Sequence, residues 1–356
     1  SEIMANLCLA SSVKDMKERF ARIIIGYTYD NQPIRAGDIH AEGAMTALMK
    51  DALKPNLVQT LEHVPAFIHG GPFANIAHGC NSVIATKTAL HLAEYVVTGA
   101  GFGADLGAEK FLDIKCRFAG LHPAAVVLVA TVRALKMNGG KAKNELTESD
   151  PDAVRRGLPN LLRHISNVKK YGVPLVVALN LFPSDTEEET KVIYEACESA
   201  GVQVADSDVF ACGGKGALEL GRKVLTAVEC GSDYKPLYNL DLTLKQKIET
   251  IAKEIYGAAD VQYDSNVEKE LKHIEEMGYG RMPVCIAKTP VSFSDDPSKL
   301  GAPEGFTLHV RDCRVAAGAG FVVILTGKIM TMPGLPKHPA AERIDVDDEG
   351  HITGLF

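Results

Sequence analysis

The sequence contains no tryptophan, no cysteine pair in C-x-x-C spacing and no apolar run long enough to span a membrane. Its eight cysteines are scattered, which is typical of reduced thiols in a cytosolic protein. The first residues do not show the pattern of a signal peptide. No Gly-Lys pair is followed by serine or threonine, so the printed sequence has no P-loop of the Walker A type. These absences predict a cytoplasmic protein without disulfides.

Charge and length set further bounds on function and organisation. The formal net charge of −7 argues against a nucleic-acid or anionic membrane partner. The 356 residues, of which 46% are apolar, are enough for two or three domains with sizeable cores.

Four segments share one pattern, in which an apolar, β-branched run precedes small or polar residues and then a helical stretch. Continuous apolar runs are what buried parallel strands require, and their alternation with helices predicts βαβ units. The sequence therefore predicts an α/β fold with a mostly parallel sheet. The four expected strands lie at residues 95–98, 124–132, 174–179 and 202–209.

The pattern of apolar residues changes after Tyr234, where we expect a smaller α+β region. Apolar residues at helical spacing predict helices over 242–256 and about 266–277. Strand-like runs follow at 283–287 and 320–325, and both are bounded by glycine or proline.

A glycine-rich segment at residues 70–82 is the strongest local signal for a site. It combines Gly70, Gly71 and Gly79 with amides and a histidine, and it carries no acidic or strongly basic side chain. Glycine lets backbone N–H groups approach a ligand closely, and amides form hydrogen bonds without the desolvation cost of a charge. The alternative is a tightly packed structural connection. We favour a loop that lines a ligand.

The carboxyl ends of the expected parallel strands indicate where ligands bind. In open α/β sheets, ligands bind beyond those ends. This rule places a set of basic, polar and aromatic side chains along one edge of the sheet. Its members are Arg133, Lys136, Asn180, Phe182 and Phe210.

Three weaker patterns concern other kinds of site. Residues 99–104 fit G-x-G-x-x-G/A, which keeps a nicotinamide-dependent oxidoreductase as an alternative, although no acidic residue stands at the ribose-binding distance. His63, His69 and His78 do not have zinc-site spacing, so hydrogen-bonded histidines are expected instead. Asp295 and Asp296 are more typical of a turn before Pro297 than of a cation site, and no metal site is predicted.

Long strings of the sequence resemble the formate–tetrahydrofolate ligase family. They are EHVPAFIHGGPFANIAHGCNS at 62–82, VATVRALKMNGG at 129–140, MTMPGLP at 330–336 and the terminal GLF at 354–356. The resemblance extends over the whole printed sequence. It implies a sheet of the P-loop NTPase type with helices on both faces and a C-terminal α+β region.

The resemblance also implies a reaction: ATP-dependent joining of formate to tetrahydrofolate, through formyl phosphate, to give 10-formyltetrahydrofolate, ADP and phosphate. It further implies Mg²⁺ with the ATP, activation by a monovalent cation and a homotetramer. Family members carry a further N-terminal third with the P-loop, so this chain alone is expected to be incomplete for catalysis unless a separate N-terminal segment completes it. A non-catalytic folate-binding or scaffolding fragment is the alternative.

The resemblance implies three domains as well. Residues 1–140 would form the remainder of the nucleotide-binding α/β domain, and residues 141–233 a second α/β domain that contributes to the folate site. Residues 234–356 would form the C-terminal α+β domain.

Site roles are carried over from the family position by position. Phe182 and Phe210 match the aromatic residues that sandwich the pterin, with Asn180 beside them. The family usually has tryptophan at Phe210 and a basic residue at Leu181, so this chain departs from the family at both positions. Smaller stacking area at Phe210 is expected to alter folate affinity or selectivity.

The remaining roles concern formate, phosphate and adenine. Arg133 and Lys136 are placed where they could meet phosphate or the glutamate tail of folate, with a structural salt bridge as the alternative. The residues expected to shape the formate and phosphate pocket are His69, Asn75 and His78. Those expected on the adenine side are Phe102, Gly103, Pro183 and Ser294.

Overall fold

The computed structural model describes residues 2–101, 103–327 and 337–354. Phe102, the motif at 330–336 and the last two residues of the terminal GLF lie outside the described residues. Within those ranges, no helix combines the length and apolar character needed to cross a membrane.

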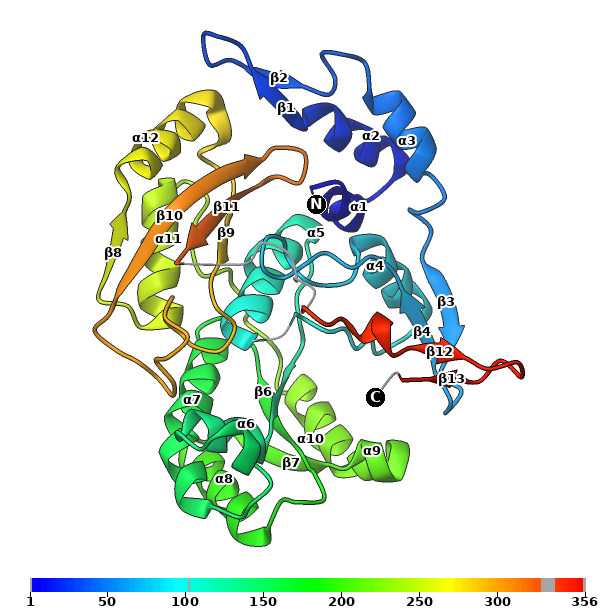
Figure 1. Cartoon of the computed structure of the whole chain (residues 1–356), viewed down its shortest axis with the longest axis vertical. Helices are drawn as coiled ribbons and strands as arrows, with labels where there is room; N and C mark the ends of the chain where they lie inside the picture. The colour runs from blue at the N-terminus through cyan, green and yellow to red at the C-terminus, as the bar shows by residue number, and fades with distance from the viewer. Residues whose placement is uncertain (1, 102, 328–336, 355–356) are drawn as a thin grey trace.

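The parallel sheet expected from the apolar runs is present, in the order β5-β6-β7. Helices α6, α7 and α8 pack their apolar residues with the strands in one core, and α10 contacts β6 and β7 from the other side (Figure 1). The predicted α/β fold with helices on both faces is therefore confirmed. The elements are β5 (Val126–Ala130), α6 (Val132–Asn138), α7 (Pro151–Lys169), β6 (Leu175–Asn180), α8 (Glu187–Ser199), β7 (Gln203–Ser207) and α10 (Leu218–Glu229).

Capping residues start these helices where the local sequence specifies. Thr186 and Glu189 form a reciprocal capping box at the start of α8, and Thr131 caps α6 through the N–H of Ala134. Strand β5 precedes residue 140, whereas β6 and β7 follow it. The expected division at residue 140 thus falls between strands of one sheet and stays a prediction.

A second, mixed sheet lies in the C-terminal part, in the order β8-β10-β11-β9. Only β10 and β11 are antiparallel neighbours. The sequence predicted β9 and β11 but not β8 or β10, because β10 alternates apolar with charged residues instead of forming an apolar run. The elements are α11 (Leu244–Ile251), continued by η5 (Ala252–Tyr256), then β8 (Asp260–Tyr263), α12 (Ser265–Ile274), η6 (Glu275–Tyr279), β9 (Val284–Ala287), β10 (Thr307–Ala316) and β11 (Phe321–Thr326).

The N-terminal part consists of four helices and two β-hairpins, β1–β2 and β3–β4. The strand expected at 95–98 is wrong: residues 93–101 have no regular secondary structure, and Val97 is 95% exposed. An apolar run without a neighbouring strand cannot complete its backbone hydrogen bonds as a strand. The elements are α1 (Glu2–Leu9), α2 (Val13–Arg22), β1 (Ile24–Tyr27), β2 (Pro33–Arg35), α3 (Glu42–Met49), β3 (Asn56–Gln59), β4 (Pro65–Ile68) and α4 (Val83–Leu92).

A largely buried helical segment joins this part to the sheets. It contains two π-helical stretches, a form that is rare and frequent at functional sites. The elements are η1 (Gly103–Ala108), η2 (Phe111–Cys116) and α5 (Arg117–Ala119). The short elements that remain are η3 (Lys143–Glu145), α9 (Val209–Cys212), η4 (Gly213–Ala217), η7 (Ala340–Glu342), β12 (Asp345–Val346) and β13 (Ile352–Thr353).

Candidate functional site

The carboxyl ends of the three parallel strands bring the predicted edge residues to one side of the sheet. Asn180 ends β6 and is paired in register with Ser207 at the end of β7. The N–H of Leu181 donates to the carbonyl of Ser207 at 3.1 Å, so the chain leaves both strands together. Phe182 and Phe210 therefore follow neighbouring strand ends, and Arg133 follows the end of β5.

Arg133 lies directly against Phe182. Its guanidinium carbon is 4.3 Å from the centre of the phenyl ring, within the range of a cation–π contact. One Nη atom is 3.4 Å from the hydroxyl of Ser184, and the buried Nε has no partner among the described residues. The guanidinium of Arg133 thus lies over one face of the Phe182 ring.

A tight turn fixes the backbone of Phe182. The N–H of Phe182 donates to Oδ2 of Asp185 at 2.9 Å, and the N–H of Asp185 donates to the carbonyl of Phe182 at 2.9 Å. Burial raises the pKa of the Asp185 carboxyl, whose second oxygen has no partner in the described structure. Pro183, between them, is exposed. Asp185 was not predicted from the sequence, although Asp three residues after Phe182 is a turn signal.

Phe210, on the short helix α9, is 96% exposed. Almost none of its ring packs on protein, so the ring is available to stack on a ligand.

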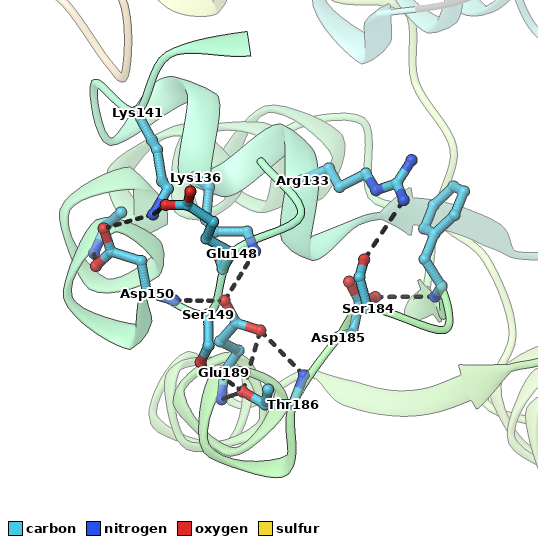
Figure 2. A network of polar contacts seen from close by, with 12 residues as sticks. Arg133, Lys136, Lys141, Glu148, Ser149, Asp150, Ser184, Asp185, Thr186 and Glu189 are labelled. Carbon is cyan, nitrogen blue, oxygen red and sulfur yellow. Dashed lines mark hydrogen bonds and ion pairs between the residues drawn. The ribbon is translucent and has the colours of Figure 1, made fainter. Parts of the chain in front are cut away.

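Lys136 lies inside the protein rather than on the edge. Its ammonium is fully buried and forms a 2.9 Å ion pair with Glu189 and a 3.0 Å hydrogen bond to the carbonyl of Glu148 (Figure 2). Glu189 also accepts the N–H of Asp150 at 2.8 Å and that of Thr186 at 3.0 Å. A fully buried ammonium has no surface to offer a ligand. For Lys136, the geometry therefore favours the alternative, a structural salt bridge, over a contact with phosphate or folate.

The glycine-rich segment borders a cavity of about 280 Å³. Its polar lining side chains are those of His69, Cys80 and Asn81, and none of its lining side chains is that of Lys, Arg, Asp or Glu. Oδ1 of Asn81 is buried without a partner among the described residues. The lining residues are Phe67, Ile68, His69, Gly70, Gly71, Pro72, Gly79, Cys80 and Asn81.

Both ring nitrogens of His69 bond to protein groups. Nε2 lies 2.7 Å from the carbonyl of Ala52, to which only an N–H can donate. Nδ1 lies 2.6 Å from the hydroxyl of Ser82, and that oxygen also accepts the N–H of Ala85 and caps α4. These contacts fix the orientation of the imidazole at the cavity wall.

His78 is completely buried, and neither ring nitrogen has a hydrogen-bond partner within the described ranges. Burial, with the nearby charges of Lys115, Arg19 and Lys110, lowers its pKa to about 3. Its imidazole is therefore neutral at physiological pH. Asn75 is half-buried in the turn that precedes it.

One comparison with known proteins identifies the family. A family model described as formate–tetrahydrofolate ligase matches residues 1–356, the whole printed sequence. The chain belongs to the formate–tetrahydrofolate ligase family. The resemblance noted in the sequence is thereby confirmed.

In this member of the ligase family, Gly101 allows close packing of the turn at 99–104 against the protein. A Cβ on Gly101 would lie 2.8 Å from the carbonyl oxygen of Gly79 and 3.1 Å from the Ala74 side chain. Because no strand precedes this turn and protein fills the space beside Gly101, the structure does not support the dinucleotide-binding alternative.

Two segments expected on the adenine side of the ligase lie close together. Asp105, two residues after Gly103, forms a 2.6 Å ion pair with buried Lys288, which also donates to the carbonyl of Ser292. The hydroxyl of buried Ser294 is 3.0 Å from that of Ser292 and donates to the carbonyl of Asp296. Lys288 was not predicted. Within the described ranges, no group of three or more His, Cys, Asp or Glu residues is arranged to hold a metal ion.

Proposed function

We propose that this chain catalyses, or contributes to, ATP-dependent ligation of formate to tetrahydrofolate. Family membership over all of residues 1–356 supports the reaction class. The structural observation that carries the proposal is the edge of the parallel sheet, where Arg133 backs Phe182 and the exposed Phe210 follows the next strand.

The reaction proceeds in two steps. A formate oxygen attacks the γ-phosphorus of MgATP, which gives formyl phosphate as ADP leaves. The N10 amine of tetrahydrofolate then attacks the formyl carbon, and phosphate leaves while the amine loses its proton. The first step brings together two anions and needs cationic groups, and the anhydride must be shielded from water.

Phe182 and Phe210 stack against the pterin, and Asn180 supplies a polar group at the same edge. Arg133 acts by holding the Phe182 ring, and Lys136 acts indirectly by fixing α6 against α8. His69, whose ring orientation is fixed by hydrogen bonds, and the backbone N–H groups of the glycine-rich segment suit a small carboxylate.

Further roles complete the proposed site. His78 and Asn75 shape the wall behind the cavity, and the adenine side comprises Phe102, Gly103, Pro183 and Ser294. Residues 1–140 form the remainder of the nucleotide-binding domain, residues 141–233 contribute to the folate site, and residues 234–356 form the third domain. Pro183 and Ser294 reach the adenine side from the second and third of these domains. A cytoplasmic homotetramer activated by a monovalent cation completes the proposal. The described residues assign no site to that cation, and no step depends on it.

Oxygen isotope transfer tests this route. With ¹⁸O-labelled formate, ATP and tetrahydrofolate, one labelled oxygen is expected in the phosphate released with each 10-formyltetrahydrofolate. Product formation with unlabelled phosphate would contradict formyl phosphate. If tetrahydrofolate binds but no product forms, either alone or with a separate N-terminal segment, the folate-binding alternative is correct.

Phe210→Ala tests the stacking role. We expect tetrahydrofolate to bind about tenfold more weakly, because a stacking face is lost, whereas ATP affinity should not change. Equilibrium titration with each ligand measures this. Tyr29→Ala is the matched control, because Tyr29 is fully exposed and far from the edge in sequence. Equal losses for both ligands would contradict the assignment.

A further inference from the structure

Glu62 joins the β3–β4 hairpin to the segment that carries Phe210. One of its carboxylate oxygens accepts the N–H of Gly214 at 2.6 Å, across 152 residues of sequence. A carboxylate that accepts an amide N–H makes a charge-assisted hydrogen bond, which is stronger than a neutral one. Figure 1 shows the hairpin extending toward α9, which ends just before Gly213.

Gly213 and Gly214 pack closely against the carboxylate of Glu62. Gly213 has φ +59° and ψ −149°, a conformation that is essentially restricted to glycine. A Cβ on either Gly213 or Gly214 would overlap the oxygens of Glu62. The backbone conformation of Gly213 requires glycine, and a Cβ on Gly214 would displace the carboxylate at the end of the Glu62 side chain, so the contact suits glycine at both positions.

Phe210 depends on its backbone for position, since its ring is almost fully exposed. Within its own segment, Asp208 donates its N–H to Gly216 and Cys212 donates its N–H to Asp208, both at 3.0 Å. Those bonds close the segment on itself but do not hold it against the rest of the molecule. The bond from Glu62 does so, three to four residues after Phe210.

We propose that Glu62 is a positioning residue for folate binding, acting as a latch that holds the Phe210 segment in place. Glu62 touches no ligand and acts through the Gly213-Gly214 backbone. The proposal rests on the proposed function, in which Phe210 stacks against the pterin. It also links folate stacking to the glycine-rich segment, because the same hairpin leads from Glu62 into residues 70–82.

A fluorescent probe tests the latch without any ligand. The chain has no tryptophan, so Phe210→Trp places a single indole at the position in question. In this background, Glu62→Ala is expected to lower indole anisotropy and increase acrylamide quenching, while Glu62→Gln, which keeps a carbonyl acceptor, has a smaller effect. Glu94→Ala, at an exposed residue without a described polar contact, is the control. Unchanged anisotropy in Glu62→Ala would overturn the proposal.

A double-mutant cycle tests whether Glu62 acts through Phe210. In the otherwise natural chain, Glu62→Ala is expected to weaken tetrahydrofolate binding about tenfold, with ATP binding and the thermal midpoint unchanged. In the Phe210→Ala background, it is expected to have no further effect. Additive losses would show that Glu62 acts elsewhere and would overturn the proposal.

Gly214→Ala provides a third comparison, because its methyl group would push the carboxylate away. It is expected to reproduce Glu62→Ala, whereas Gly221→Ala, where a Cβ has open space, should not. If the unsubstituted chain binds no tetrahydrofolate, the proposed function fails, but the anisotropy measurement still decides whether the latch exists.

Discussion

Two buried glutamates in different regions show what decides the behaviour of a buried charge. Glu189 at the α6–α8 contact and Glu109 in the helical segment between η1 and η2 are both at most 1% exposed. Burial alone would raise the pKa of Glu189, but Lys136 and backbone N–H donors lower it. For Glu109, burial and the nearby charge of Asp113 raise the pKa well above its usual value.

The difference lies in the partners rather than in the depth of burial. Lys136 directs its ammonium to Glu189, whereas Lys110, next to Glu109 in sequence, donates to the carbonyl of Ala74 instead. Neither oxygen of Glu109 has a hydrogen-bond partner in the described part of the chain. The pKa of a buried carboxyl is thus lowered where a cation and N–H donors surround it and raised where they do not.

Lys136→Met, which removes the partner of Glu189, is expected to destabilise the fold more than any other variant considered. It leaves Glu189 buried without its counter-ion, and we expect a loss of about 3–5 kcal/mol in the free energy of unfolding. Urea denaturation followed by circular dichroism measures the loss. Lys136→Met combined with Glu189→Gln should recover part of it, because no unpaired charge remains. A single variant as stable as the natural chain would contradict the assignment.

Glu109→Gln removes the carboxyl whose pKa the fold raises. Because the pKa of Glu109 is higher in the folded chain than its value of 4.5 in the unfolded chain, the protonated carboxyl stabilises the fold fully below pH 4.5. This stability is lost as pH rises through the pKa of Glu109 in the folded chain. The variant is expected to be more stable by about 1–3 kcal/mol near pH 8 and equal near pH 4.

Unfolding at several pH values measures this difference, with exposed Glu94→Gln as the control. Both proteins retain Asp113, and burial raises the pKa of its carboxyl from 3.8 to about 6. The free energy of unfolding of both proteins therefore declines as pH rises over that range. A difference independent of pH would count against a raised pKa of Glu109.

Thr186→Ala removes one donor to Glu189 and is expected to have the smallest effect of these variants. Thr186 donates its hydroxyl to Glu189 at 3.0 Å and caps α8, so its loss should cost about 1 kcal/mol in the free energy of unfolding. Thr190→Ala on the same helix, whose hydroxyl bonds only to the carbonyl of Glu187, is the matched control in the same denaturation experiment. Equal costs for both variants would argue against the capping role.

Much of the sheet was predictable because its signals are local. Apolar, β-branched runs predicted β5, β6 and β7, and the shared direction of parallel strands placed Arg133, Phe182 and Phe210 at one edge. The same reasoning failed at residues 95–98, where an apolar run has no strand beside it, and at β10, whose alternation lacks a continuous apolar run.

The sequence was enough to identify the family, because its motifs match along the whole chain, and to predict the βαβ pattern, because each strand and helix signal is local. Only the tertiary structure decided that Lys136 pairs with Glu189, that Arg133 covers Phe182 and that Glu62 meets Gly214. These partners stand roughly 50 to 150 residues apart. An ammonium, a guanidinium or a carboxylate offers the same chemistry to many partners, and only the folded chain determines which one lies within reach.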